Sequence, residues 1–325
     1  MRLIFWPFAF FVRVPIFVCM SELKIGLIGG SGLGDALEAG AGAVHHEVET
    51  PFGRPSGPIL ETQWDGLPIL FLSRHGPGHL FNPSHVPFRA NIFALKQLGC
   101  THIIASGAVG SLREECKPRD LVVVDQVIDK TSRRAGTFFE KAAVHVDFAE
   151  PFCPVLRRIL IEEGAGETTY RVHGRGCYVC MEGPAFSTRA ESLMHRLWGG
   201  DLIGMTAMPE AKLAREAEIA YALVALVTDY DCWKRPITDV TAAPAAGAVD
   251  AGELMKEIIA NLTAASDNAI ALIRRAVGRL AAQQDALPAS PAHDALRLGI
   301  WSDKSRVDPQ EVERLAPLWG RHFKG

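Results

Sequence analysis

The chain has 325 residues, 22% of them charged and 48% hydrophobic, which is the composition of an ordinary globular protein and excludes a disordered or fibrous one. Its formal net charge is −3 at pH 7 and it contains no basic run, so we do not expect it to bind nucleic acid. This length is enough for one large α/β domain or for two smaller domains.

Seven cysteines are scattered along the sequence without the spacing of a disulfide scaffold, which favours a reducing, cytoplasmic environment. Cys177 and Cys180 have the CxxC spacing of zinc and redox sites, yet neither a second such pair nor a histidine pair accompanies them. We therefore expect ordinary strand cysteines at these two positions and no metal site in the chain.

Residues 1–20 are almost entirely apolar and aromatic, with Arg2 and Arg13 as their charged residues. The segment has some features of a signal peptide, but Arg13 interrupts it, no A-x-A-like cleavage site is present, and the run is too short to span a bilayer. We favour a start codon assigned too far upstream, with Met20 as the true beginning. Accordingly, we expect no association with a membrane.

Short apolar runs alternate with helical spacings from residue 24 onward. The apolar runs predict buried strands over 24–28, 68–73, 102–106, 121–127, 201–205 and 219–227. The helical spacings predict helices over 91–99, 155–163, 189–198, 209–218 and about 252–282. Strands that alternate with helices indicate a doubly wound α/β sheet rather than an all-β fold or a helical bundle.

The composition and the alternation of strands and helices together divide the chain into three segments. The apolar extension covers 1–20, and one main domain covers 21–282, including an Ala-, Pro- and Gly-rich loop over 236–249. Residues 283–325 are predicted to form a linker followed by a small C-terminal appendage.

Two aspartates, Asp229 and Asp231, follow the apolar run over 219–227. Ligands of open α/β sheets bind beyond the carboxyl ends of the strands, so paired carboxylates here suit a flat ligand that offers hydrogen-bond donors. Tyr230 and Trp233 flank the pair. A solvated loop with two helix-capping acids is the ordinary alternative when the pair is considered alone.

Four other strand ends carry groups that suit an anion. The glycine-rich turns predicted at 29–32 and 106–111 expose backbone N–H groups, and a guanidinium can bond two oxygens of an oxyanion at once. The candidate donors are Ser31, Arg74, His75, Gly107 and Ala108 of the second turn, and Thr206 beside Met205. Considered separately, the glycine-rich turn at 29–32 could be an ordinary tight turn, and Arg74 with His75 could form a surface ion pair. Together with the acid pair, they fit a ligand with an oxyanion at one end and a donor-bearing ring at the other.

From about Ile25 to Lys234 the chain resembles the trimeric purine nucleoside phosphorylase family. The motifs that carry the resemblance are Ile28-Gly29-Gly30-Ser31-Gly32-Leu33, Thr50-Pro51-Phe52-Gly53, Arg74-His75-Gly76, Asn91-Ile92-Phe93-Ala94-Leu95-Lys96, Gly110-Ser111-Leu112-Arg113-Glu114-Glu115, Ala149-Glu150-Pro151-Phe152-Cys153-Pro154, Glu182-Gly183-Pro184, Ser187-Thr188-Arg189-Ala190-Glu191-Ser192, Met205-Thr206 and Thr228-Asp229-Tyr230-Asp231-Cys232-Trp233-Lys234. So many motifs in one order make the resemblance specific.

This resemblance implies a mixed central sheet flanked by helices, in a single nucleoside phosphorylase-like domain that assembles as a homotrimer. Members split the N-glycosidic bond of a purine nucleoside with inorganic phosphate, so the expected partners are a nucleoside and phosphate, with no metal or other cofactor. The phosphate-binding positions match Ser31, Arg74, His75, Gly107, Ala108 and Thr206. The nucleoside-binding positions match Met205, Ser187, Asp229, Asp231 and, for the 5′ pocket of a neighbouring subunit, His145.

Asp229 is the expected catalytic residue, because adenine leaves only when its N7 is protonated or strongly hydrogen-bonded. The acid pair also favours adenine, since a 6-amino purine donates to carboxylates whereas a 6-oxo purine presents an acceptor. A buried acceptor that faces the wrong base costs about 1–3 kcal/mol. Together with what the resemblance implies about the reaction, this preference for adenine leads us to expect phosphorolysis of 5′-methylthioadenosine. The alternatives are a 6-oxopurine nucleoside or methylthioinosine as substrate, and a nucleoside-binding protein without turnover.

Three features depart from the family pattern. Gly107 occupies the position of a threonine, which removes one hydroxyl from the phosphate site, and Ala185 occupies the position of an arginine. The 236–249 loop differs in length and composition from the segment that leads to the last family helix. Because that segment helps to form the 5′ pocket, the sequence does not identify the residues that contact the 5′ group.

Overall fold

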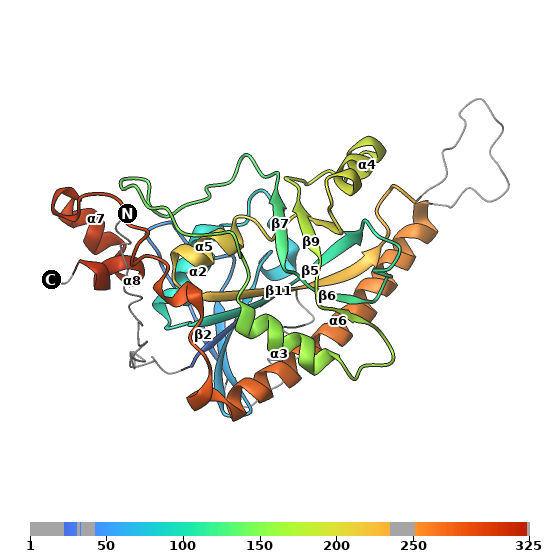
Figure 1. Cartoon of the computed structure of the whole chain (residues 1–325), viewed down its shortest axis with the longest axis horizontal. Coiled ribbons are helices and arrows are strands. Elements are labelled where there is room, and N and C mark those ends of the chain that lie inside the picture. The colour runs from blue at the N-terminus through green and yellow to red at the C-terminus, as the bar shows by residue number, and fades with distance from the viewer. Residues whose placement is uncertain (1–22, 31–32, 34–42, 235–250, 324–325) are drawn as a thin grey trace, which may run out of the picture.

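The computed structural model describes residues 23–30, 33, 43–234 and 251–323. Ser31, the extension over 1–20 and the 236–249 loop therefore lie outside the described residues. The described chain folds around an 11-stranded mixed sheet with helices on both faces (Figure 1). This arrangement confirms the predicted fold class.

The strands are short at the edges of the sheet and long at its centre. They are β1 (Ile25–Gly29), β2 (Val44–His46), β3 (Ile59–Trp64), β4 (Leu67–Ser73), β5 (His102–Ser111), β6 (Leu121–Val123), β7 (Gln126–Asp129), β8 (Val172–His173), β9 (Cys177–Cys180), β10 (Leu202–Gly204) and β11 (Ala220–Asp229). The α-helices are α2 (Phe88–Gln97), α3 (Pro154–Gly164), α4 (Arg189–Leu197), α5 (Glu210–Glu216), α6 (Ala251–Ala282), α7 (Pro309–Arg314) and α8 (Ala316–Trp319).

The centre of the sheet is parallel and most of its margins are not. β4, β1, β5 and β11 lie side by side in parallel, and β3 and β2 extend β4 as antiparallel strands. β10 pairs antiparallel with β5 and continues in parallel to β9 and β7, while β6 pairs antiparallel with β11. The sheet is thus mixed, as the family resemblance implied, rather than a wholly parallel doubly wound sheet.

The two-sided packing of strand β11 explains why the sequence over 219–227 is apolar without interruption. Its alternate side chains belong to two different hydrophobic clusters, one containing Tyr221, Leu223, Ala225 and Val227 and the other containing Ala220, Ala222, Val224 and Leu226. Helices α2 and α5 pack on the first face, and α3 and α6 pack on the second (Figure 1). A strand covered by helices on both faces has no solvent-facing positions, so polar alternation is lost.

Two predicted segments differ from the structure. The run over 121–127 is not one strand, because β6 ends at Val123 and β7 begins at Gln126 and pairs with β9 instead of β11. The strand predicted over 102–106 continues to Ser111, so the predicted glycine-rich turn is strand. Glycine is uncommon in strand interiors, which is why the sequence favoured a turn.

The C-terminal segment packs into the same core as α2 and α5. Leu318 and Trp319 of α8 are almost fully buried in that cluster. Glu218, which is also buried, accepts hydrogen bonds from the backbone N–H of Leu296 and from Arg321. Residues 283–323 are therefore held by both apolar packing and a buried carboxylate. Within the described part of the chain, no helix combines the length and the apolar character that crossing a membrane would require.

Candidate active site

The neighbours of β5 change partway along one of its edges. β1 pairs with β5 as far as Ala105, and β10 pairs with it from Gly110 onward, whereas β11 covers the other edge. Among the described strands, no partner is paired with the first edge over 106–109, and a cavity of about 730 Å³ lies against this stretch. Open α/β sheets typically bind ligands at such a change of neighbours.

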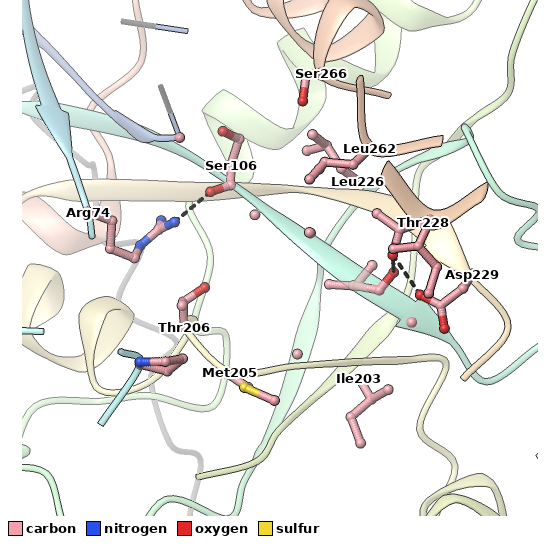
Figure 2. Close-up of a pocket in the computed structure, with 18 of the residues that line it drawn as sticks. Arg74, Ser106, Ile203, Met205, Thr206, Leu226, Thr228, Asp229, Leu262 and Ser266 are labelled. Atoms are coloured by element: carbon pink, nitrogen blue, oxygen red, sulfur yellow. Dashed lines mark hydrogen bonds between the residues drawn. The ribbon is translucent and has the colours of Figure 1, made fainter. Parts of the chain in front are cut away.

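The cavity gathers most of the site residues that were predicted from sequence. Those that line it are Arg74, His75, Gly107, Ala108, Ser187, Met205, Thr206, Asp229 and Asp231. Figure 2 shows Arg74 and Thr206 at one end and Asp229 at the other, with Met205 and Leu226 between them. The predicted anion donors and the acid pair are thus at opposite ends of one cavity, as the polarity of the strand ends predicted.

The guanidinium of Arg74 is fixed by a buried carboxylate. Its Nε and Nη2 donate to the two oxygens of Glu210 at 2.7 and 2.9 Å, and its Nη1 donates to the Ser106 carbonyl at 2.7 Å. The Tyr221 hydroxyl also donates to Glu210, at 2.8 Å. Burial opposes a charge on Arg74, but the carboxylate of Glu210 outweighs this and raises the pKa of the guanidinium. Of the five N–H donors of an arginine, two remain for a ligand.

The open edge of β5 supplies backbone donors. Residues i and i+2 of a strand turn their N–H and C=O groups to the same edge. The Ser106 carbonyl faces Arg74 and the Val109 carbonyl faces Thr228 on the opposite side, so the N–H of Ala108 faces the cavity edge. Exposed amides were predicted here from a turn, and they arise instead because the strands beside β5 diverge.

His75 presents an acceptor rather than a cation. Its Nδ1 lies 2.7 Å from the carbonyl oxygen of Phe81 and donates its hydrogen there, which leaves the lone pair of the neutral ring on Nε2. Burial, together with nearby Arg74 and His79, lowers the pKa of His75 to about 4. The ring of His79 stacks on that of His75 at 4.2 Å. The imidazole is therefore neutral at pH 7.

Gly107 leaves room between two of the predicted anion donors. A Cβ atom at this position would lie 3.3 Å from Thr206 Oγ1 and 3.8 Å from Arg74 Nη1. A hydroxyl carried at residue 107 would thus fall between these groups. Without it, the donors at this end include Arg74, Thr206 and the Ala108 amide.

The acid pair is held by short local contacts. Asp229 lies at the end of β11, where its Oδ1 accepts from Thr228 Oγ1 at 2.6 Å and its Oδ2 accepts from the Asp231 N–H at 2.9 Å. Asp231 has a positive φ of 48° and accepts a hydrogen bond from Ser192 Oγ of α4. The two carboxylates are consequently fixed before any ligand arrives.

Gly110→Ala tests how tightly Asp231 is positioned. The new Cβ would lie 3.2 Å from both the Asp231 Cβ and the Ile203 Cγ2, so both neighbours would have to move. We expect kcat/KM for an adenine nucleoside to fall about tenfold, since small displacements of site groups reduce rates steeply. Gly136→Ala, whose Cβ meets no atom within 4 Å, is the matched control. Equal rates for the two variants would show that this contact does not position Asp231.

A buried arginine supports the segment that carries Met205 and Thr206. Arg134 donates to the carbonyls of Met205 and Met208, both at 2.6 Å, and to Glu182 Oε1 at 3.1 Å. Glu182 is adjacent to the loop in which Ala185 departs from the family pattern. In this chain, Arg134 therefore contributes a guanidinium beneath that loop.

The long helix α6 forms an apolar wall that the sequence did not identify. Met255, Ile258, Leu262 and Ser266 recur every three or four residues and line the cavity. An amphipathic pattern usually indicates a helix whose apolar face packs on the hydrophobic core. The sequence pattern therefore gave no reason to expect these side chains in a ligand-binding cavity. These side chains of α6 form the apolar side of the cavity. The sequence of the 236–249 loop had not identified any residues for that side.

His145 does not line the cavity of its own chain. The centroids of its ring and the Trp301 ring are 4.5 Å apart, and its backbone N–H donates to the Gly299 carbonyl at 2.8 Å. Trp301 is 71% exposed, so this pair faces the surface. The structure thus places His145 against the C-terminal segment and outside the lining of the cavity that gathers most of the other predicted site residues.

Residues 24–278 match the phosphorylase superfamily. The S-methyl-5′-thioadenosine phosphorylase of Thermosynechococcus vestitus is 45% identical over 303 residues, which cover 92% of this chain and 99% of the relative. The enzyme of the same name from Cereibacter sphaeroides is 46% identical, covering 94% of this chain and 100% of the relative. This chain belongs to the phosphorylase superfamily.

Solved structures of the superfamily show the same fold. A methylthioadenosine phosphorylase from an antarctic soil metagenomic library is 44% identical, with a TM-score of 0.81 over 91% of this chain and 99% of that one. The methylthioadenosine phosphorylase of Schistosoma mansoni in complex with adenine is 35% identical, with a TM-score of 0.74 over 86% of this chain and 99% of that one. The phosphorylase fold was thus correctly predicted from the motifs.

Proposed function

We propose that this chain catalyses phosphorolysis of 5′-methylthioadenosine to adenine and 5-methylthioribose 1-phosphate. The observation that carries the proposal is a single cavity with three parts: anion donors around Arg74, a fixed carboxylate pair at the opposite end, and an apolar wall from α6. The relatives and solved structures named above, with this substrate in their names, support the same reaction.

The anion end fits inorganic phosphate. Two N–H groups of Arg74, the Thr206 hydroxyl and the Ala108 amide converge on the open edge of β5, and we assign the phosphate site to them together with His75 and Gly107. We also assign Ser31 to this site, on the sequence motif alone. Met205 lies between the two ends, where a thioether can pack against the sugar.

The base end fits adenine. We assign Asp229 and Asp231, with Ser187, to the purine, and Asp229 to the proton that N7 must receive as the C1′–N9 bond breaks. The electron pair of that bond goes to the base, and a phosphate oxygen then bonds to C1′. Phosphate held beside C1′ stabilises the oxocarbenium-like state before it captures it. No metal or other cofactor takes part in this scheme.

Ile258→Ser is expected to change the preference at the 5′ group. Ile258 lines the cavity, whereas its neighbour Ile259 is 56% exposed and is absent from the lining, so Ile259→Ser is the matched control. Loss of apolar contact with a methylthio group should lower kcat/KM for methylthioadenosine about 10- to 100-fold and that for adenosine much less. An equal loss for both nucleosides would show that this wall does not contact the 5′ substituent.

Parallel assays of base release test the choice of substrate. Methylthioadenosine, adenosine and inosine would be given to the protein with phosphate, and we expect adenine from methylthioadenosine to appear fastest. Faster release from inosine would favour the 6-oxopurine alternative and contradict the assignment of the acid pair. No release from any of them would favour a nucleoside-binding protein without turnover.

We further propose that the enzyme is a cytoplasmic homotrimer in which His145 reaches the 5′ pocket of a neighbouring subunit. The exposed position of the His145–Trp301 pair, outside the cavity of its own chain, supports this arrangement. No disulfide joins the cysteines of the described residues, which agrees with a reducing compartment. Light scattering should give a mass about three times the 35.3 kDa of the chain.

A further inference from the structure

The oxyanion end of the cavity contains an acceptor as well as donors. The carbonyl oxygen of Phe81 can only accept, so the hydrogen of the His75 ring is on Nδ1, 2.7 Å away. Nε2, on the opposite side of the ring, then holds a lone pair. Since His75 lines the cavity and Nε2 makes no hydrogen bond to the described residues, this lone pair is available to a ligand.

The groups around His75 keep the ring neutral. Arg74 precedes it in the chain, His79 stacks on it at 4.2 Å, and Glu210 is the nearby carboxylate. Glu210 and the Phe81 carbonyl favour a charged ring, but burial, Arg74 and His79 oppose it and the pKa falls to about 4. Moreover, Glu210 is already bonded by Arg74 and Tyr221.

The carboxylate of Glu210 neutralises the positive charge of Arg74 before an anion binds. The ion pair of Arg74 with Glu210 has no formal net charge, and both side chains are at least 97% buried. Attraction by net charge is therefore small, and the direction of each hydrogen bond decides which oxyanion fits. Buried groups that are left without the correct partner discriminate between otherwise similar ligands.

We propose that His75 Nε2 accepts a hydrogen bond from an O–H of the oxyanion, so that the site selects an anion that carries a proton. This inference rests on the proposed phosphate site. Phosphate and arsenate both carry a proton near pH 7, whereas sulfate has the same tetrahedral shape and carries none. Sulfate would place a bare oxygen against the lone pair of His75.

Competition between anions tests the inference with the unmodified enzyme. Inhibition of adenine release by sulfate would be measured against phosphate at constant ionic strength, with arsenate as the protonated control. We expect sulfate to bind at least about tenfold more weakly than phosphate, which is the effect of one mismatched hydrogen bond. Arsenate should replace phosphate in supporting base release.

His75→Lys then reverses the direction of the hydrogen bond, because an ammonium group can only donate. In this variant we expect the ratio of sulfate to phosphate dissociation constants to fall to within about threefold of unity. Equal binding of sulfate and phosphate by the unmodified enzyme, with phosphate-dependent turnover intact, would overturn the role of His75 and leave the proposed function standing. Failure of phosphate to bind or to support turnover would instead contradict the proposed function itself.

Discussion

Asp229→Asn should lower kcat for methylthioadenosine by about 10²- to 10⁴-fold, the usual contribution of a positioned general acid. The amide oxygen can still accept from the Asp231 N–H, and the amide NH₂ can donate to Thr228 Oγ1, whose own hydrogen then goes to the Val109 carbonyl, but the amide has no acidic proton to transfer. The variant therefore removes the chemistry with little change in shape. Steady-state kinetics, with adenine release followed at saturating phosphate, would measure the loss.

Two comparisons make this result specific. Asp285→Asn, in the exposed 3₁₀ turn Gln284–Ala286, is the matched control and should keep normal turnover. A 5′-methylthioadenosine methylated at N7 supplies a base that leaves without protonation, so the difference between Asp229→Asn and the unmodified enzyme should largely disappear with it. Normal turnover of the natural substrate by Asp229→Asn would remove this residue from its assigned role.

Arg74→Met is expected to abolish phosphate-dependent turnover and also to unfold the protein more readily. It leaves Glu210, which is 1% exposed, as a buried carboxylate without its cation. Loss of one partner of such a pair typically costs about 3–5 kcal/mol in the free energy of unfolding. Urea denaturation and the dependence of adenine release on phosphate concentration would measure the two effects separately.

The double variant Arg74→Met/Glu210→Leu separates stability from function. Replacing both charges by apolar side chains of similar size is often close to neutral, so the free energy of unfolding should recover part of the loss. About 1–3 kcal/mol should remain missing, because the buried Tyr221 hydroxyl loses Glu210 as its acceptor. Turnover should not recover, because the two N–H donors that we assign to phosphate are still missing. If activity returned together with stability, Arg74 would have a structural role only.

The sequence predicted the polarity of the site because strand ends meet in space. Arg74 follows β4 and Asp229 ends β11, and the parallel strands β4, β1, β5 and β11 bring their carboxyl ends to one edge of the sheet. Thr206 follows β10, which runs antiparallel to β5 from Ser111 toward the unpaired stretch over 106–109. Their meeting in one cavity therefore followed from recognising the strands. The role of each side chain stays a prediction until it is tested by substitution.

Other parts of the site depend on contacts that no local pattern records. Glu210 is 136 positions from the arginine that it holds, and a glutamate near the start of a short helix gives no sign of such a partner. The glycines of β5 favoured a turn, because local propensity does not include the pairing of this strand with β11. The role proposed for His145 involves a second copy of the chain. A single sequence gives information about that copy only through the family resemblance.

The most direct test of the proposed reaction is to identify the sugar product by ³¹P NMR. The purified protein would be incubated with methylthioadenosine and phosphate, and with methylthioadenosine alone. The proposed reaction predicts a new sugar 1-phosphate resonance that grows in step with released adenine, and no adenine when phosphate is omitted. Adenine released at the same rate without phosphate, with no phosphate ester formed, would contradict phosphorolysis and identify the reaction as hydrolysis.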